Sequence, residues 1–362
     1  MAPSGGAPLR IGLIADIQYS DCDDGTDFSG AEHRHFRSSL EIARNAVGVW
    51  NAAEVHAVVQ LGDIIDGCNT QRGASASALQ TVLDVLAGIN APMGRFDLIG
   101  NHELYNVDRH QLGRSGLRCL GESGRTFYSR ELGDCWEAIF LDAFETSLIG
   151  MSRESPGYQR AVELLSVHNP KVVDGTPGDW FDGLPERLHR YVPYNGAVSA
   201  EQLAWLGEAL GEVQRKGRSV LVFTHVPLLS SATKPKTVAW NAEDVLALLH
   251  THSDRVVAVI AGHDHDGGYA VDAKGIHHIT MNSALTAQPG SDCFAILECH
   301  EGWAVFQSYG RACVESGTMG KGRYYEQLVL AKGAVNEPRA SAPVSDAAAL
   351  ASPRIYRAAR RC

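Results

Sequence analysis

Long apolar runs, paired cysteines and positive charge are all scarce in this sequence. No apolar run approaches the roughly 20 residues that a membrane helix needs, so we expect no membrane association. The eight cysteines are scattered and form no Cys-x-x-Cys pair, and a chain of 362 residues can build its core without disulfides. We therefore expect reduced thiols and a cytoplasmic protein.

The balance of charge is acidic, with 32 Lys and Arg against 42 Asp and Glu and a formal net charge of −10. An acidic chain does not suggest a protein that binds nucleic acid or a membrane surface. A small anionic substrate would need local positive charge, which bound metal cations can supply. We expect a monomer whose partners are small molecules.

The composition along the chain predicts one large domain. Residues 1–8 lack the basic and apolar regions of a signal peptide, and we expect a short flexible leader there. Residues 334–362 are rich in Ala, Pro and Ser, so we expect a mostly disordered tail. Residues 9–333 form the expected domain. It contains an irregular insertion at about 147–199, whose aromatic residues favour an ordered cover over the site.

Five apolar segments share one arrangement. Each is typical of a buried strand and stops at, or one residue before, a segment with a metal-binding side chain. The segments are 9–15, 55–61, 95–99, 220–223 and 255–261, and the side chains after them are Asp16, Asp63, Asn101, His225 and His263. In open α/β sheets ligands bind at the carboxyl ends of the strands. The sequence therefore predicts an α/β fold with a metal site at this edge.

Between and after these strands the pattern indicates helices and short antiparallel strands. Helices are predicted at about 32–51, 75–88, 199–215, with Ser199 as N-cap, and from the cap Asn241 to about 250. Antiparallel strands are predicted at 126–131, 136–142, 269–271, 276–280, 294–299 and 304–309.

Asp63 is the natural carboxylate to bridge two metal ions, which lie about 3.5–4 Å apart in dinuclear hydrolases. The other candidate ligands divide between the ions as Asp16, Gln18 and His265 for one and Asn101, His225 and His263 for the other. On an extended segment, side chains two residues apart share a face, which would bring His263 and His265 to the same side of the chain. A lone Asp after a strand is more often a helix N-cap than a ligand, but the whole series favours a metal site.

The motifs Asp-x-Gln, Gly-Asp-x-x-Asp, Gly-Asn-His-Glu, Thr-His and Gly-His-x-His follow in that order. This series resembles the calcineurin-like metallophosphoesterase family over about residues 9–310. The resemblance implies a four-layer α/β/β/α sandwich. It also implies that His102 stabilises the phosphate or protonates the leaving oxygen. We expect Glu103 to orient a neighbouring group rather than to bind metal. Gln18 stands where the family usually has His, and an amide oxygen favours Mn²⁺, although Fe, Zn and Mg are compatible.

One branch of the family, the manganese-dependent ADP-ribose/CDP-alcohol diphosphatases, is similar in four separate segments. They begin at Asp16, Ile99, Tyr194 and Gly262. This resemblance implies two-metal hydrolysis of the diphosphate bond in ADP-ribose, CDP-alcohols and related nucleoside diphosphate compounds, with release of AMP or CMP. The alternatives are a phosphomonoesterase or cyclic-nucleotide phosphodiesterase with the same metals, and a non-catalytic scaffold. A silent scaffold should have lost ligands, and none is missing here.

Four residues outside the motifs are candidates for contact with the substrate. Arg34 and Arg37 lie in the first turns of the predicted helix and could face a phosphate. Tyr194 and Asn195 could contact the nucleotide. The alternative for each is a solvated helix face or loop packing. For Trp180 and its neighbour Phe181, we favour packing over stacking on a base.

Overall fold

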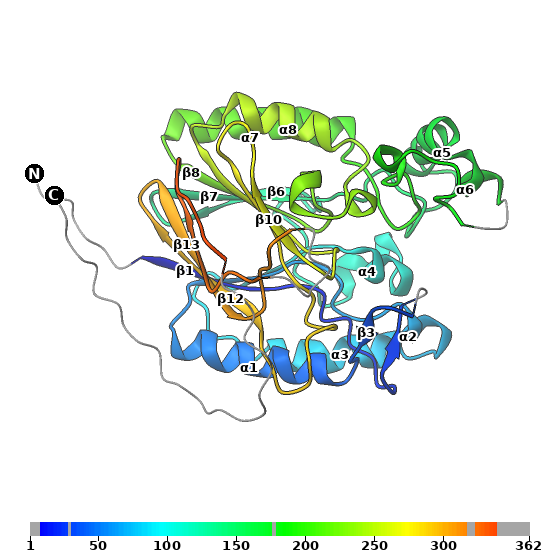
Figure 1. The fold of residues 1–362 in the computed structure, drawn as a ribbon, viewed down its shortest axis with the longest axis horizontal. Coiled ribbons are helices and arrows are strands. Elements are labelled where there is room, and N and C mark those ends of the chain that lie inside the picture. Colours follow the sequence, from blue (N-terminus) through cyan, green and yellow to red (C-terminus); the bar gives the residue numbers. More distant parts are fainter. Residues whose placement is uncertain (1–7, 28–29, 176–178, 317–322, 339–362) are drawn as a thin grey trace, which may run out of the picture.

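Two six-stranded sheets form the centre of the molecule, with helices outside each of them (Figure 1). The computed structural model describes residues 8–27, 30–175, 179–316 and 323–338. The expected leader and most of the expected tail, residues 1–7 and 339–362, lie outside the described residues. The order of layers is helix, sheet, sheet, helix, and this confirms the predicted α/β/β/α sandwich.

The first sheet has the order β14-β13-β12-β1-β4-β5. Its strands are β1 (Leu9–Ile14), β4 (Ala57–Gln60), β5 (Arg95–Asp97), β12 (Cys293–His300), β13 (Trp303–Gly310) and β14 (Gln327–Leu330). β1, β4 and β5 are mutually parallel, and the hairpin β12–β13 joins them antiparallel through β1. The three parallel strands therefore end at the same edge, as predicted. β14 was not predicted.

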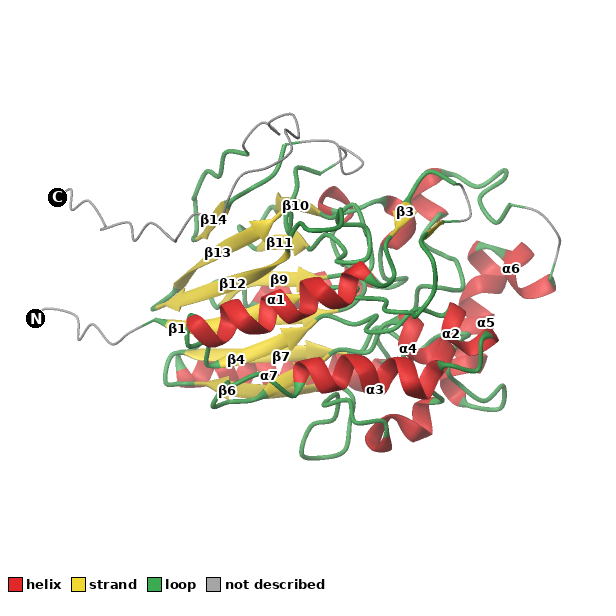
Figure 2. Ribbon diagram, turned by 90° about the horizontal axis from the view of Figure 1, so that it is seen from below, coloured by secondary structure: helices red, strands yellow, loops and turns green. Residues whose placement is uncertain are grey.

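The second sheet has the order β10-β11-β9-β8-β7-β6. Its strands are β6 (Tyr128–Leu132), β7 (Trp136–Leu141), β8 (Ser219–Thr224), β9 (Val256–Ala261), β10 (Gly268–Val271) and β11 (His277–Thr280). β7, β8, β9 and β11 run parallel, whereas β6 and β10 are antiparallel edge strands. The parallel strands of both sheets end on the side where α2, α4 and α5 lie (Figure 2).

Four helices form the outer layers. α1 (Ser38–Ala52) and α3 (Ser75–Leu86) cover the first sheet, while α7 (Ala200–Lys216) and α8 (Ala242–Thr251) cover the second (Figure 1). Further helices lie near the strand ends, namely α2 (Cys68–Gln71), α4 (Asn101–Asn106), α5 (Pro156–His168) and α6 (Pro170–Asp174). The 3₁₀ turns are η1 (Arg109–Arg114), η2 (Glu186–Leu188), η3 (Ser230–Ala232) and η4 (Pro235–Thr237). Among the described residues, no helix combines the length and apolar character required to span a bilayer.

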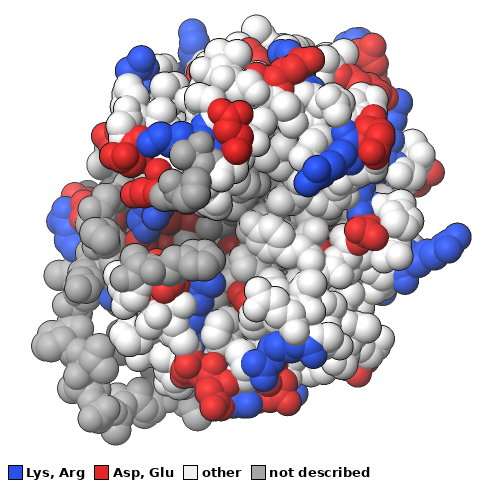
Figure 3. All heavy atoms as spheres, turned by 90° about the vertical axis from the view of Figure 1, so that its right-hand side faces the viewer, with Lys and Arg blue, Asp and Glu red and all other residues white. Residues whose placement is uncertain are grey.

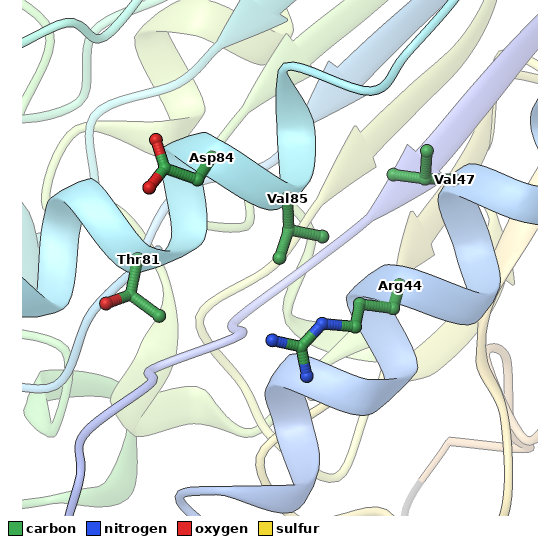
Figure 4. Close-up of a pocket in the computed structure, with 5 residues that line it drawn as sticks. All are labelled: Arg44, Val47, Thr81, Asp84 and Val85. Atoms are coloured by element: carbon green, nitrogen blue, oxygen red, sulfur yellow. The ribbon is translucent and has the colours of Figure 1, made fainter.

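Trp50 fixes α1 on the first sheet. Its side chain is fully buried and its indole Nε1 donates to the carbonyl oxygen of Ala295 over 3.1 Å. A Cβ at Gly12 of β1 would lie 2.7 Å from the indole ring, so only glycine leaves room for it. A surface groove of about 440 Å³ lies between α1 and α3, lined by Arg44, Val47, Thr81, Asp84 and Val85 (Figure 4). None of these residues belongs to the predicted metal site.

One predicted helix start and one predicted side-chain cap differ from the structure. The helix predicted from residue 32 begins at Ser38, because His33–Arg34 forms strand β3, which pairs antiparallel with β2 (Gly25–Thr26). Arg34 therefore lies on a two-stranded ribbon rather than in the helix. Asn241 precedes α8, but its side chain bonds to both backbone groups of Val198 instead of capping the helix.

The predicted N-cap of α7 agrees with the structure, whereas the predicted insertion and tail contain ordered features. Ser199 caps α7, since its hydroxyl accepts the backbone N–H of Gln202 over 3.1 Å. The insertion predicted as irregular contains α5, α6 and η2. Within the segment expected to be a disordered tail, Asn336 is described. Its amide donates to the hydroxyl of Tyr269 and to the backbone of β14.

Candidate metal centre

The carboxylate of Asp63 lies at the centre of the predicted ligand set. Its Oδ2 is 3.1 Å from Nε2 of Gln18 on one side and 3.4 Å from Nε2 of His225 on the other. Asp63, His225 and His263 offer ligand atoms that all lie within 4.8 Å of one another, and all three side chains are buried. This central position is the one that a bridging carboxylate needs.

The remaining ligands fall into the two groups that the sequence predicts. On one side, Nε2 of His225 is 3.2 Å from Nδ1 of His263 and 3.3 Å from Oδ1 of Asn101. On the other side, Nε2 of His265 is 2.8 Å from Nε2 of Gln18 and 3.7 Å from Oδ1 of Asp16. All seven predicted ligands therefore come together, and the structure brings them from both sheets.

The backbone at the site is unusual. Asp16, Gln18, Asp63 and His263 have positive φ angles of 50°, 40°, 58° and 71°, and among the described residues the only other non-glycine with positive φ is Glu54. This conformation is uncommon for residues with a side chain and clusters at functional sites. The expectation that the paired ligands sit on extended segments is therefore wrong. These four residues instead adopt the left-handed conformation, which turns the chain sharply near the end of a strand.

Two glycines in the motifs are required by close approach. A Cβ at Gly100 would lie 2.1 Å from Oδ1 of Asp63, and a Cβ at Gly62 would lie 2.3 Å from Nδ1 of His225. Gly62 also has a φ of +99°, which side chains rarely adopt. The glycines before Asp63 and Asn101 therefore each make room for a predicted ligand from another segment of the chain.

Glu103 holds the loop that carries Asp63. Its carboxylate is buried and accepts the backbone N–H groups of Asp63 at 2.8 Å, Ile64, and Gly100 at 2.6 Å. Burial raises the pKa of Glu103 to about 7, and the nearby charge of Asp63 adds to this shift. Glu103 thus orients the ligand loop, in line with its expected role.

The ligand histidines are each held in one tautomer by an acceptor on the outer ring nitrogen. Nδ1 of His225 is 2.7 Å from the carbonyl oxygen of Leu61, and Nδ1 of His265 is 2.7 Å from the carboxylate of Glu32. Nε2 of His263 is 2.7 Å from Oδ1 of Asn195. Because these partners only accept, the outer nitrogen of each ring carries a proton, and the inner nitrogen is the one available to bind an ion.

His102 has the opposite arrangement. The backbone N–H of Gly67 donates to its Nδ1 over 2.7 Å, so in the neutral ring Nε2 carries the proton. Asp66 Oδ2 also lies 3.3 Å from Nδ1. Burial lowers the pKa of His102, although Asp63 and Asp66 oppose this shift. In its neutral form, His102 therefore offers its Nε2–H as a hydrogen-bond donor beside the predicted ligand Asn101.

The pKa values of the ionisable side chains at the site are shifted in a way that favours bound cations. Burial lowers the pKa of His225, but Asp63 outweighs it and raises that pKa to about 9. Glu32 does the same for His265, whose pKa is also raised to about 9 against the effect of burial. Burial raises the pKa of Asp16 to about 7. The carboxylates thus draw protons onto the ligand nitrogens, where divalent cations would supply the positive charge instead.

The donor atoms also fit such ions. Oε1 of Gln18 is buried and has no hydrogen-bond partner within the described part of the chain, and a half-turn of the amide group would exchange this oxygen with the Nε2 that faces Asp63 and His265. The set combines carboxylate, amide and imidazole donors, as borderline and hard divalent metals require. Figure 3 views the face where the strands end, and acidic and basic side chains border a hollow there.

Comparison with known proteins places this site in a family. Residues 9–267 match the calcineurin-like phosphoesterase family. The chain belongs to that family. The residues matched contain every predicted ligand of this phosphoesterase, from Asp16 to His265, and His102 as well.

Relatives of this phosphoesterase are similar over most of their length. A protein of Danio rerio named manganese-dependent ADP-ribose/CDP-alcohol diphosphatase is 37% identical over 314 residues, which are 84% of this chain and 96% of the relative. A human protein of the same name is 32% identical over 318 residues, 84% of this chain and 90% of the relative. The crystal structure of a dimetal phosphatase from Danio rerio superimposes with a TM-score of 0.80 at 33% identity, covering 91% of this chain and all of that one.

The candidate substrate residues of this phosphoesterase are placed differently from one another. The Nη1 atom of Arg34 is 3.9 Å from Oδ2 of Asp66, close to His102. Arg37 is half exposed and pairs with the exposed side chains of Asp21 and Asp23. Tyr194 is half-buried, with its ring 5.9 Å from the ring of His263.

Asn195 is fully buried and its Nδ2 donates to two backbone carbonyl groups, which turns its Oδ1 toward His263. In the structure its contact is with a ligand histidine. Of the two neighbouring aromatics, Phe181 packs on His189, whereas Trp180 is 38% exposed and lies 6.3 Å from the ring of Tyr194.

Sequence reasoning missed two residues of the phosphoesterase site. Glu32 lies in a polar loop with no pattern that points to His265, which is 233 residues away. Asp264 is buried between the two histidines of Gly-His-x-His, and its Oδ2 accepts from the hydroxyl of Thr233 and the backbone of Lys234, both at 2.8 Å. Asp264 holds the turn that carries His263 and His265. Its position inside the Gly-His-x-His motif is the sequence feature from which it could have been predicted.

Proposed function

We propose that this protein is a metal-dependent diphosphatase that hydrolyses the diphosphate bond of ADP-ribose, CDP-alcohols and related nucleoside diphosphate compounds, releasing AMP or CMP. The observation that carries the proposal is the complete ligand set around Asp63. It occurs in a chain that shares 32–37% identity with diphosphatases of this name over most of their length. Small nucleoside diphosphate compounds are the proposed partners.

The seven ligands and their acceptors would hold two divalent cations, with Asp63 between them. We assign Mn²⁺ as the preferred metal, because Gln18 offers an amide oxygen where imidazole is usual, and the relatives are named manganese-dependent. Such ions would supply positive charge to the phosphoryl oxygens and would lower the pKa of a water molecule, which is the chemistry that hydrolysis near neutral pH requires.

His102 contributes a hydrogen bond to the reacting phosphate. Its Nδ1 is occupied by the N–H of Gly67, so the Nε2–H is the group left to face a phosphoryl oxygen. A neutral imidazole donates a hydrogen bond readily but gives up its proton poorly. We therefore favour stabilisation of the phosphate over protonation of the leaving oxygen. A phosphate leaving group is itself weakly basic and does not need a strong acid.

Arg34 and Tyr194 are the proposed contacts with the rest of the substrate. Arg34 lies near His102 and carries a planar guanidinium suited to the second phosphate. Tyr194 lies beside His263 and next to the exposed ring of Trp180, where a base could stack. Arg37 is held in exposed ion pairs with Asp21 and Asp23, so we assign it a smaller contribution.

Product analysis tests this function. Protein stripped of metal is incubated with ADP-ribose or CDP-choline, with and without added Mn²⁺ or Mg²⁺, and AMP or CMP is quantified. We expect Mn²⁺-dependent release of both, and no release by Asp63→Asn, which removes the bridging carboxylate. Hydrolysis of AMP or cyclic AMP, but of neither diphosphate, would overturn the substrate assignment and retain the metal site. No hydrolysis with metal bound would favour the scaffold alternative.

A further inference from the structure

Glu32 bonds directly to one of the ligand histidines. Its Oε1 lies 2.7 Å from Nδ1 of His265, whose side chain is only 9% exposed. Among the ligand histidines, His225 has a backbone carbonyl as its outer acceptor and His263 has a buried amide. His265 depends instead on a carboxylate from a surface loop. That acceptor is the only one of the three that is charged.

The backbone around Glu32 is held firmly. Its carbonyl oxygen accepts the N–H of Asp27 over 2.9 Å, and its own N–H donates to Oδ1 of Asp27 over 3.1 Å. Beyond it, strand β3 pairs with β2, and the N–H of His35 donates to the carbonyl oxygen of Leu285 over 2.8 Å. The loop therefore presents the carboxylate from a fixed position, which a positioning role requires.

Arg34 restrains the same carboxylate and leads to the second functional histidine. Its Nε donates to Oε1 of Glu32 over 3.2 Å, and its Nη1 lies 3.9 Å from Oδ2 of Asp66. Asp66 in turn lies 3.3 Å from Nδ1 of His102. One row of polar side chains thus runs from the ligand His265 to the phosphate-facing His102.

We propose that Glu32 is the positioning residue for the metal ligand His265. Its carboxylate fixes the proton on Nδ1 and the plane of the ring, so that Nε2 stays available for the ion that Asp16 and Gln18 would also bind. Partners of this kind on a ligand histidine typically change metal affinity by about 10–100-fold. The inference rests on the metal centre and is independent of which nucleotide the enzyme cleaves.

The test is a titration of metal-free protein with Mn²⁺ in the absence of substrate. Binding is monitored by calorimetry and by electron paramagnetic resonance. We expect Glu32→Ala to lower the affinity for one of the two Mn²⁺ ions by about 10–100-fold and to leave the affinity for the other ion near its original value. Glu32→Gln keeps an acceptor oxygen at the same distance from the backbone, so it should lose less Mn²⁺ affinity than Glu32→Ala. Glu32→Asp keeps the charge but shortens the side chain, so it should lose more than Glu32→Gln.

Glu41→Ala is the matched control, since Glu41 is an exposed carboxylate on α1 that pairs with Arg44. It should leave both affinities unchanged. Two Mn²⁺ ions bound at wild-type affinity in Glu32→Ala would overturn the proposal. So would full affinity in Glu32→Asp together with loss in Glu32→Gln, because charge and not position would then matter. If Glu32→Ala does not fold, the relative Mn²⁺ affinities of Glu32→Gln and Glu32→Asp decide between position and charge. Absence of diphosphatase activity in the wild-type protein with both ions bound would count against the substrate assignment alone.

Discussion

The backbone N–H of Gly67 points at Nδ1 of His102 over 2.7 Å, and this one bond sets the proton on the far side of the ring. The ligand histidines have acceptors in the equivalent place, so a donor there distinguishes His102 from them. The same side chain type thus serves as ligand or as hydrogen-bond donor according to its outer partner.

The first prediction concerns His102. His102→Ala should keep both metal ions and lose about 10²–10³-fold in turnover, because one donor to the transition state is removed. Metal content and kcat with ADP-ribose measure the two effects. His110→Ala, an exposed histidine of η1, is the control and should be unchanged. A fully active His102→Ala enzyme would remove His102 from the mechanism.

The second prediction concerns Gly100. Gly100→Ala would place a Cβ 2.1 Å from Oδ1 of Asp63, so the bridging carboxylate must move. We expect metal affinity to fall by more than about tenfold, measured by Mn²⁺ titration. Gly48→Ala in α1 is the control, since its Cβ meets nothing within 4 Å. It should stabilise the helix by about 0.5–1 kcal/mol. Unchanged affinity in Gly100→Ala would contradict the close approach.

The third prediction concerns the buried ion pair of Asp142 and Arg109. Burial opposes ionisation of Asp142, but Arg109, with its nitrogens 2.6 and 3.2 Å from the carboxylate oxygens, lowers the pKa of Asp142. A lowered pKa stabilises the fold above the pKa of the unfolded chain, and this contribution is lost as the pH falls toward the folded value. Asp142→Asn should therefore reduce the free energy of unfolding at pH 7 and flatten its dependence on pH in the acid range.

We expect a loss of roughly 3 kcal/mol for Asp142→Asn, because it leaves a mostly buried guanidinium without its charge partner. Urea unfolding at pH 7 and between pH 3 and 5 measures both effects. Glu122→Gln removes an ion pair with Arg130 in which the Glu122 side chain is 84% exposed, and it should cost less than about 1 kcal/mol. Equal losses in the two variants would show that burial of the pair is unimportant.

The fourth prediction concerns Trp180, which borders Tyr194 near the metal centre. If a base stacks there, AMP binding in the presence of Mn²⁺ should quench tryptophan fluorescence, and Trp180→Phe should abolish most of that quenching. Trp303→Phe is a matched control, because Trp303 is 37% exposed and stacks on His300, where β12 turns into β13. If the quenching persists in Trp180→Phe, Trp180 does not stack on the base, and the packing role expected from the sequence is supported.

The sequence by itself determined which residues are the candidate ligands. Apolar runs that stop at Asp, Asn or His are local patterns, and the chemistry of a ligand depends on its side chain, so Asp63 and its partners could be predicted. The sandwich followed from the resemblance that these motifs carry. Helix boundaries near the site could not be predicted, because residues 33–34 gain their strand partner from the β2–β3 ribbon.

Only the tertiary structure decided how the ligands are aimed. The left-handed turns at Asp16, Gln18, Asp63 and His263 depend on strands that meet from two sheets. The protons on the ligand histidines are set by Leu61, Asn195 and Glu32, which lie 68 to 233 residues away along the chain. No local pattern records such contacts, because a hydrogen bond between distant segments exists only once the fold has brought them within about 3 Å.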